Sequence, residues 1–225
     1  MPRCINFNYS IKTMKKKNLI NYWDNYYDNI KNFSESSFAR FALKYLGKKL
    51  RGKKIIDIGC GNGRDSLYFY KQKLDVMGID ISKNVIKKNL NYSTPKLKFV
   101  NLDIGKKSIS KKFDFIYSRF FLHAINEKNE NKLLKLINKI KKKNTILFLE
   151  YRNHKDLIFK NIKNKKHNQL IEFENGHFRR IIYTEMFIKK ISKFFKGKII
   201  FNKSAKNLSI VKKDNPNLSR IIFKF

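Results

Sequence analysis

The chain alternates between short apolar runs and longer amphipathic segments, a pattern that predicts strands and helices in turn. Runs rich in β-branched residues are typical of buried strands, and apolar residues three or four positions apart are typical of helices. Two helices come first: aromatic residues at helical spacing over 22–27, then a helix start at 34–37 with a stop at Gly47. After them, the predicted strands are 55–58, 76–79, 97–100, 113–117 and 145–149, and the helical segments between them are 66–70, 82–89 and 128–143.

The last third of the chain is less regular. It contains a polar, basic segment at 161–168 and a predicted helix at 184–195. Two predicted strands follow at 198–211 and 218–225, around a turn at 214–217. Strands that alternate with helices imply an α/β fold with a doubly wound, mainly parallel sheet. In such sheets ligands bind beyond the carboxyl ends of the strands, where the sequence places Asp57, Asp80, Asp103, His123 and Arg152.

Residues 54–66 carry the most informative local pattern. Gly59, Gly61 and Gly63 alternate directly after a predicted strand, and a helical segment follows them. Glycine lets the backbone turn sharply and lets a ligand approach where a Cβ would clash. The order of strand, glycine turn and helix is therefore that of a nucleotide-binding βαβ unit. The next strand ends in Asp80, whose carboxylate is placed to accept hydrogen bonds from ribose hydroxyls.

The glycines, with Asp57 in the first strand and Asp80 after the second, resemble two motifs of class I S-adenosylmethionine-dependent methyltransferases. An ordinary glycine turn at a helix start is the alternative interpretation. The resemblance implies S-adenosylmethionine as cofactor and a Rossmann-like sheet of about seven strands with an antiparallel C-terminal hairpin. It also implies N-terminal helices that pack against the domain or cover its site. The cofactor-binding residues that it implies are Asp57, Gly59, Gly61, Gly63, Asp80 and Asp103, the last near the adenine amino group, although a turn aspartate is also common.

Four further segments resemble, more narrowly, small bacterial methyltransferases associated with capsule and cell-surface glycan biosynthesis. These segments are 119–123, 150–152, 176–180 and 213–216. The similarity extends over about residues 20–225, and the lysine-rich loop at 160–168 departs from it. The resemblance implies methyl transfer by in-line displacement to a small, anionic or sugar-type acceptor such as a glycan precursor.

His123 is the candidate general base. Methyl transfer from a sulfonium needs alignment and exclusion of water, and a neutral hydroxyl acceptor also needs a base. The ordinary pKa of histidine suits that task near neutrality, and a purely structural histidine is the alternative. We expect Arg119, four residues earlier, to act with His123 as a catalytic residue.

Further basic residues are expected to bind the substrate, because arginine binds phosphate or carboxylate through paired hydrogen bonds. The substrate-binding candidates are Arg152, His177 and Arg180. Arg179, in contrast, is expected to face solvent. The alternative is that some of these arginines pair with carboxylates at the sheet edge, namely Glu150, Glu172 or Glu174.

The net charge of +35 suits a nucleic-acid partner, so an RNA or protein methyltransferase is the second hypothesis. The lysines are, however, spread over the whole chain among many Asn, Ile, Phe and Tyr residues. These amino acids share A/T-rich codons, so a biased genome would give the same composition, and a nucleic-acid partner is not favoured. A third hypothesis is a non-enzymatic cofactor-binding protein on the same fold.

The 225 residues suggest one domain at 19–225 after a disordered leader at 1–18, in which Met14 is an alternative start. No apolar run approaches the length of a membrane span. Cys4 and Cys60 are isolated, which favours a reduced, cytoplasmic setting over a disulfide framework. No metal site is expected.

Overall fold

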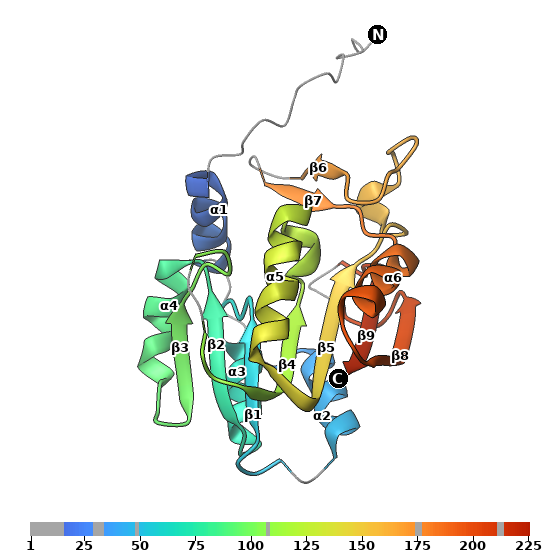
Figure 1. The fold of residues 1–225 in the computed structure, drawn as a ribbon. Helices are drawn as coiled ribbons and strands as arrows, with labels where there is room; N and C mark the ends of the chain where they lie inside the picture. The colour runs from blue at the N-terminus through green and yellow to red at the C-terminus, as the bar shows by residue number, and fades with distance from the viewer. Residues whose placement is uncertain (1–15, 29–33, 48–49, 107–108, 174–176, 211–213) are drawn as a thin grey trace.

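The computed structural model describes residues 16–28, 34–47, 50–106, 109–173, 177–210 and 214–225. Their core is a seven-stranded sheet made of β1 (Lys54–Ile58), β2 (Asp75–Asp80), β3 (Leu97–Asn101), β4 (Phe113–Arg119), β5 (Lys141–Arg152), β8 (Lys198–Ala205) and β9 (Leu218–Lys224). The strand order is β3-β2-β1-β4-β5-β9-β8 (Figure 1). The first five strands are parallel, β9 runs antiparallel to β5, and β8 runs antiparallel to β9. The predicted doubly wound sheet with an antiparallel C-terminal hairpin is confirmed.

Helices cover both faces of this sheet. One face carries α2 (Ser37–Leu46), α3 (Arg64–Lys71) and α4 (Lys83–Asn89), and the other carries α5 (Glu127–Ile140) and α6 (Thr184–Phe194). Successive strand residues point to opposite faces. In β1, Ile55 therefore packs in the core below α2 and α3, whereas Ile56 and Ile58 pack in the core below α5 and α6.

Side-chain caps place the helices where the sequence predicts them. Ser36 Oγ accepts a hydrogen bond from Ala39 N at 3.0 Å, and Ser82 Oγ accepts one from Val85 N at 3.1 Å. These bonds satisfy backbone donors that a first helical turn leaves unpaired. Gly47 ends α2 with φ +73°, as predicted. The start and end of α2 and the start of α4 are thus encoded by residues next to these helix ends.

Some boundaries differ from the prediction. The helix α3 begins at Arg64 rather than at residue 66, and α5 ends at Ile140 instead of continuing to residue 143. The three lysines after Ile140 belong to β5, where Thr145 Oγ1 accepts from Lys142 N and donates to Phe113 O. These bonds tie the lysine segment to the sheet, against its helical pattern. Strand β8 ends at Ala205, short of the predicted residue 211.

Two elements lie over the carboxyl ends of the parallel strands: helix α1 (Lys16–Asp28) and a two-stranded sheet of β6 (Leu170–Glu172) and β7 (Phe178–Arg180) (Figure 1). The sequence did not predict β6 and β7, because three-residue strands are too short for a periodic signal. Helix α1 includes the last three residues of the predicted leader, and 1–15 lie outside the described residues. Three 3₁₀ turns complete the list: η1 (Leu90–Tyr92), η2 (Leu122–Ala124) and η3 (Leu157–Phe159). Among the described helices, none has the length and apolar character needed to cross a membrane.

Candidate active site at the carboxyl edge of the sheet

Asp80 ties the glycine turn to the start of α4. Its Oδ2 accepts a hydrogen bond from Gly61 N at 3.0 Å, and its Oδ1 accepts one from Ser82 N at 3.0 Å. Burial raises the pKa of Asp80, although these backbone hydrogen bonds act in the opposite direction. Each carboxylate oxygen has a further lone pair, and Asp80 lines a cavity of about 350 Å³ at this edge of the sheet. The carboxylate is therefore fixed in place and still able to accept bonds from a ligand.

Two further carboxylates, Asp57 and Asp65, line the same cavity. Asp57 in β1 accepts a hydrogen bond from Ser66 Oγ at 2.7 Å. Burial, reinforced by the nearby Asp65 carboxylate, raises the pKa of Asp57 to about 8, against the hydrogen bond from Ser66. Asp65 in the first turn of α3 is held by Ser36 N at 2.7 Å and by Tyr117 Oη at 2.8 Å. Sequence reasoning missed Asp65, although an acidic residue in the first turn of a helix after a glycine turn is a usable signal.

The remaining predicted cofactor positions differ in their surroundings. Gly59 lines the cavity, as does Asp103, whose Oδ1 accepts from Gly105 N at 3.0 Å. Gly61 and Gly63 do not line the cavity, and a Cβ added at either would meet a protein side chain, Tyr27 and Phe99, respectively. These two glycines therefore shape the turn.

Helix α1 forms the roof of the cavity. Trp23, Tyr26 and Tyr27 line it from above. A Cβ at Gly61 would lie 2.2 Å from Tyr27 Oη, so the ring of Tyr27 rests directly on the glycine turn. Burial, with the nearby Asp80 carboxylate, raises the pKa of Tyr27. Ser82 Oγ also donates to Asp24, which fastens α1 to the start of α4. Covering the site was one of the two roles foreseen for this helix.

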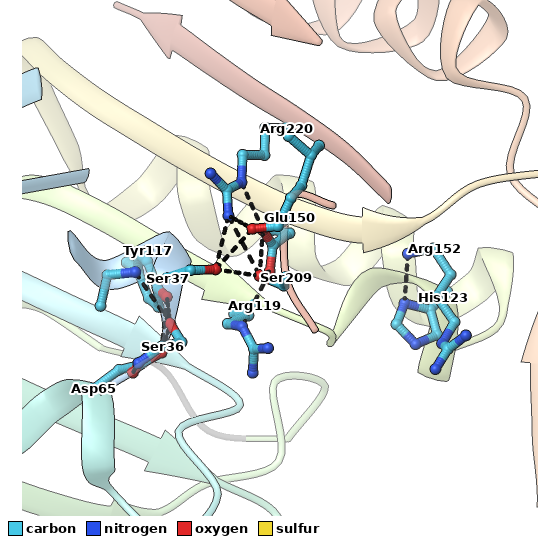
Figure 2. Close-up of polar contacts among 12 residues, drawn as sticks. Ser36, Ser37, Asp65, Tyr117, Arg119, His123, Glu150, Arg152, Ser209 and Arg220 are labelled. Carbon is cyan, nitrogen blue, oxygen red and sulfur yellow. Dashed lines mark hydrogen bonds and ion pairs between the residues drawn. The ribbon is translucent and has the colours of Figure 1, made fainter. Parts of the chain in front are cut away.

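Arg119, at the end of β4, reaches the cavity but is held by a carboxylate. Its Nε donates to Glu150 Oε1 at 3.0 Å, and the guanidinium stacks over Phe120 with 4.1 Å from Cζ to the ring centroid. Glu150 is fully buried and also accepts from Arg220 Nε at 2.7 Å and from Ser209 Oγ (Figure 2). Burial lowers the pKa of Arg119, but Glu150 together with Asp65 and Tyr117 more than offsets this, so that the pKa is raised. The predicted alternative of a sheet-edge ion pair therefore applies to Arg119.

His123 and Arg152 meet at the ends of β4 and β5. The backbone N–H of Arg152 donates to His123 Nδ1 at 3.2 Å, as Figure 2 shows. Burial lowers the pKa of His123, and the neighbouring Arg179 and Arg152 cations lower it further. The neutral ring then carries its proton on Nε2. His123 lines the cavity, where the N–H at Nε2 is a hydrogen-bond donor.

Arg152 lines the cavity with its charge already paired. Its Nη1 donates to both oxygens of Asp156, at 3.0 and 3.1 Å, and its Nη2 donates to Asp214. Asp156 in turn accepts from Asn217 N at 2.8 Å. Arg152 therefore connects the segment after β5 to the segment before β9. These bonds leave few of its guanidinium N–H groups for a substrate.

The structure places Arg179 and Arg180 differently from the expectation: Arg179 does not face solvent, and Arg180 does not line the cavity. Arg180 is fully buried, pairs with Glu130 Oε2 at 2.6 Å and donates to Leu122 O at 3.0 Å, away from the cavity. Arg179, expected to face solvent, is 92% buried and lines the cavity. His177, two residues earlier, is buried against Tyr22 with ring centroids 4.1 Å apart and does not line the cavity. The nearby Gly176 and Glu174, and Lys213, lie outside the described residues.

No group of three or more His, Cys, Asp or Glu side chains within the described parts of the chain is arranged to hold a metal ion. The buried Cys60 thiol is free, and burial raises its pKa, which makes it a poor nucleophile.

Comparison with known proteins gives one family match and several relatives. Residues 19–191 match a family model described as a methyltransferase domain. A ubiquinone biosynthesis O-methyltransferase of Pelagibacter ubique is 30% identical over 123 residues, which are 53% of this chain and 50% of that protein. A putative methyltransferase of invertebrate iridescent virus 6 is 32% identical over 106 residues, 44% of this chain and 40% of that protein. The matches thus span half or less of the length of these relatives.

Among solved structures, the fold is similar to 1,6-didemethyltoxoflavin-N1-methyltransferase of Burkholderia thailandensis with bound S-adenosylhomocysteine. The TM-score is 0.69 at 13% identity, over 92% of this chain and 87% of that one. A glycopeptide N-methyltransferase complexed with S-adenosylhomocysteine gives a TM-score of 0.64 at 11% identity, over 85% and 90% of the two chains. The family match covers more than half of the sequence, and the chain therefore belongs to the methyltransferase domain family of S-adenosylmethionine-dependent enzymes.

Proposed function

We propose that this domain transfers a methyl group from S-adenosylmethionine to a small acceptor that carries an anionic group. The distribution of charge along the cavity supports this proposal. Its carboxylates come from the β1–β3 half of the sheet: Asp57, Asp65, Asp80 and Asp103. The guanidinium groups of Arg119, Arg152 and Arg179 line the other part, from the ends of β4, β5 and β7, with the neutral His123 among them, and Arg64 lies beside Asp65 on the acidic side. Such a gradient favours a cationic sulfonium on one side and an anion on the other.

The acidic part of the cavity fits the cofactor. Gly59 and Cys60 of the turn line the cavity, and Asp80 offers carboxylate lone pairs toward it. We propose that Asp80 holds the ribose hydroxyls and that Asp103 lies near the adenine. S-adenosylmethionine supplies a methyl carbon that the sulfonium already activates for in-line displacement. The contribution of the protein is then alignment and exclusion of water, for which the α1 roof is placed.

We propose that His123 donates a hydrogen bond to the acceptor. With Nδ1 occupied by the Arg152 backbone N–H, the available ring atom is Nε2 with its proton. An acceptor that enters as an oxyanion has no proton to lose, so the site needs donors and no general base. This favours an anionic acceptor, whose class includes the sugar phosphates and acids of glycan precursors.

A large nucleic-acid substrate is less well supported. A basic cluster surrounds Asp114 at the N-terminal ends of β1, β4 and β5, and its members are Arg51, Lys53, Lys54, Lys111, Lys112 and Lys142. It lies at the opposite edge of the sheet from the cavity. A polyanion bound there would not reach the methyl donor, whereas the roofed cavity suits a small molecule.

The test is transfer of an isotope-labelled methyl group from S-adenosylmethionine to a panel of small acceptors. The panel pairs carboxylates and sugar phosphates with neutral amides and alcohols of matched size. We expect label only in the anionic members, and retained activity in His123→Gln, because glutamine keeps an N–H at this place but cannot act as a base.

Two results would count against the proposal. One is preferential labelling of the neutral acceptors. The other is a loss of methyl-transfer activity of about 10²–10⁴-fold in the His123→Gln variant, the range expected when a general base is removed. This second result would count only against the role proposed for His123.

A further inference from the structure

Arg179 differs from Arg119 and Arg152, two other arginines that line the cavity, in having no carboxylate partner within the described residues. Arg119 pairs with Glu150 at 3.0 Å, and Arg152 pairs with Asp156 at 3.0 Å. No ion pair of Arg179 occurs within the described residues, although its side chain is almost completely buried. An uncompensated buried charge is costly. Within the described residues the charge of Arg179 is therefore not taken up by a carboxylate and is available to a bound anion.

The surroundings of Arg179 hold the guanidinium in a fixed position. Its Cζ lies 4.5 Å from the centroid of the Phe173 ring and 5.8 Å from that of Trp23. Its Nη1 donates to Phe178 O at 3.2 Å, and its buried Nε has no hydrogen-bond partner among the described residues. Burial lowers the pKa of Arg179, while Tyr22, through its charge and a side-chain hydrogen bond, acts in the opposite direction. The Nε–H is therefore a donor that faces no acceptor in the described part of the chain.

The strand geometry of β7 explains why Arg179 and not Arg180 is in this position. Alternate residues of a strand point to opposite sides. His177 stacks on Tyr22 of α1, and Arg179, two residues on, shares this side and lines the cavity. Arg180 points the other way, to Glu130 of α5.

We propose that Arg179 binds the anionic group of the acceptor and thereby determines which acceptors the enzyme accepts. This inference rests on the proposed function. The ligand chemistry is an oxyanion, carboxylate or phosphate, held by the guanidinium fork through two parallel hydrogen bonds. The anion replaces the missing carboxylate partner, and the Phe173 and Trp23 rings keep water from the ion pair.

The experiment uses Trp23, the sole tryptophan of the chain, as the reporter. Its ring lies next to the Arg179 guanidinium, so its fluorescence should respond to an anion bound there. Inorganic phosphate and acetate are titrated separately, at constant ionic strength with chloride and with saturating S-adenosylhomocysteine. The variants are Arg179→Gln, Arg179→Lys, and Arg40→Gln as control, because Arg40 is an exposed arginine that pairs only with Glu35 among the described residues.

We expect a saturable response in the wild type to at least one anion, and the stronger binder identifies the group. Arg179→Gln should bind it at least tenfold more weakly, Arg179→Lys should lie in between because lysine keeps the charge without the fork, and Arg40→Gln should match the wild type. Equal anion affinity in Arg179→Gln and wild type would overturn the proposal. So would the absence of any saturable response in a wild type that binds S-adenosylhomocysteine by calorimetry. Failure of the cofactor itself to bind would instead count against the proposed function.

Discussion

Replacing Glu150 by glutamine is expected to lower the free energy of unfolding by about 3–5 kcal/mol. Glu150 is 1% exposed and accepts hydrogen bonds from Arg119 and Arg220 at 3.0 and 2.7 Å. The amide keeps the shape of the carboxylate but removes the only negative charge between these two guanidinium groups among the described residues. It therefore leaves two largely buried cations without a counter-charge. Urea unfolding at pH 7 measures the effect.

The matched control is Glu35→Gln. Glu35 also pairs with an arginine, Arg40 at 3.1 Å, but that arginine side chain is 57% exposed. Exposed pairs contribute about 0–1 kcal/mol, so the control should unfold almost as the wild type does. If Glu150→Gln lowered the free energy of unfolding by less than about 1 kcal/mol, Glu150 would not be the residue that balances the charge of both arginines.

Gly61→Ala is the second change with a large expected effect. Its φ of +52° is unfavourable for alanine, and the new Cβ would lie 2.2 Å from Tyr27 Oη and 2.4 Å from its Cζ. The backbone cannot easily yield, because Gly61 N donates to Asp80 and Gly61 O accepts from Asn89 Nδ2 at 2.8 Å. Tyr27 must therefore move, and α1 should loosen from the glycine turn. We expect the free energy of unfolding to fall by about 1–3 kcal/mol from overpacking, in addition to about 1–2 kcal/mol from backbone strain.

Gly52→Ala separates the two contributions. Gly52 has a positive φ of +75° in the turn that Lys53 N closes on Leu50 O, and a Cβ there would meet nothing within 4 Å. This control should show the backbone strain alone, with unchanged fluorescence of Trp23 in α1. If thermal unfolding showed that the two variants lose the same amount of stability, Tyr27 would not be packed on the glycine turn.

The fold and the cofactor side of the site follow from local sequence features. The glycine turn, Asp57 in β1 and Asp80 at the end of β2 stand within a single βαβ unit. Their spacing alone places them at one edge of a parallel sheet. The caps at Ser36 and Ser82 are equally local.

The substrate side depends on contacts between distant segments, which no local pattern encodes. Whether an arginine faces the cavity or a carboxylate depends on where its partner lies: Glu150 for Arg119 and Glu130 for Arg180. In β7, a shift of one residue exchanges the two sides of the strand. A three-residue strand is too short to show hydrophobic alternation, so the sequence could not indicate which residues of β7 point to the same side. The adjacent Arg179 and Arg180 were therefore assigned to the wrong sides.

The central claim is that the glycine turn and Asp80 bind S-adenosylmethionine, and calorimetric titration of the cofactor tests it most directly. The wild type should bind, and Asp80→Asn should bind at least tenfold more weakly, because a charge-assisted hydrogen bond is worth about 1.5–3 kcal/mol. Asp114→Asn is the control: it makes the same chemical change at the opposite edge of the sheet, where Asp114 accepts from Lys54 N at 2.9 Å. It should bind the cofactor as the wild type does. No binding by the folded wild type, or equal binding by Asp80→Asn, would contradict the account.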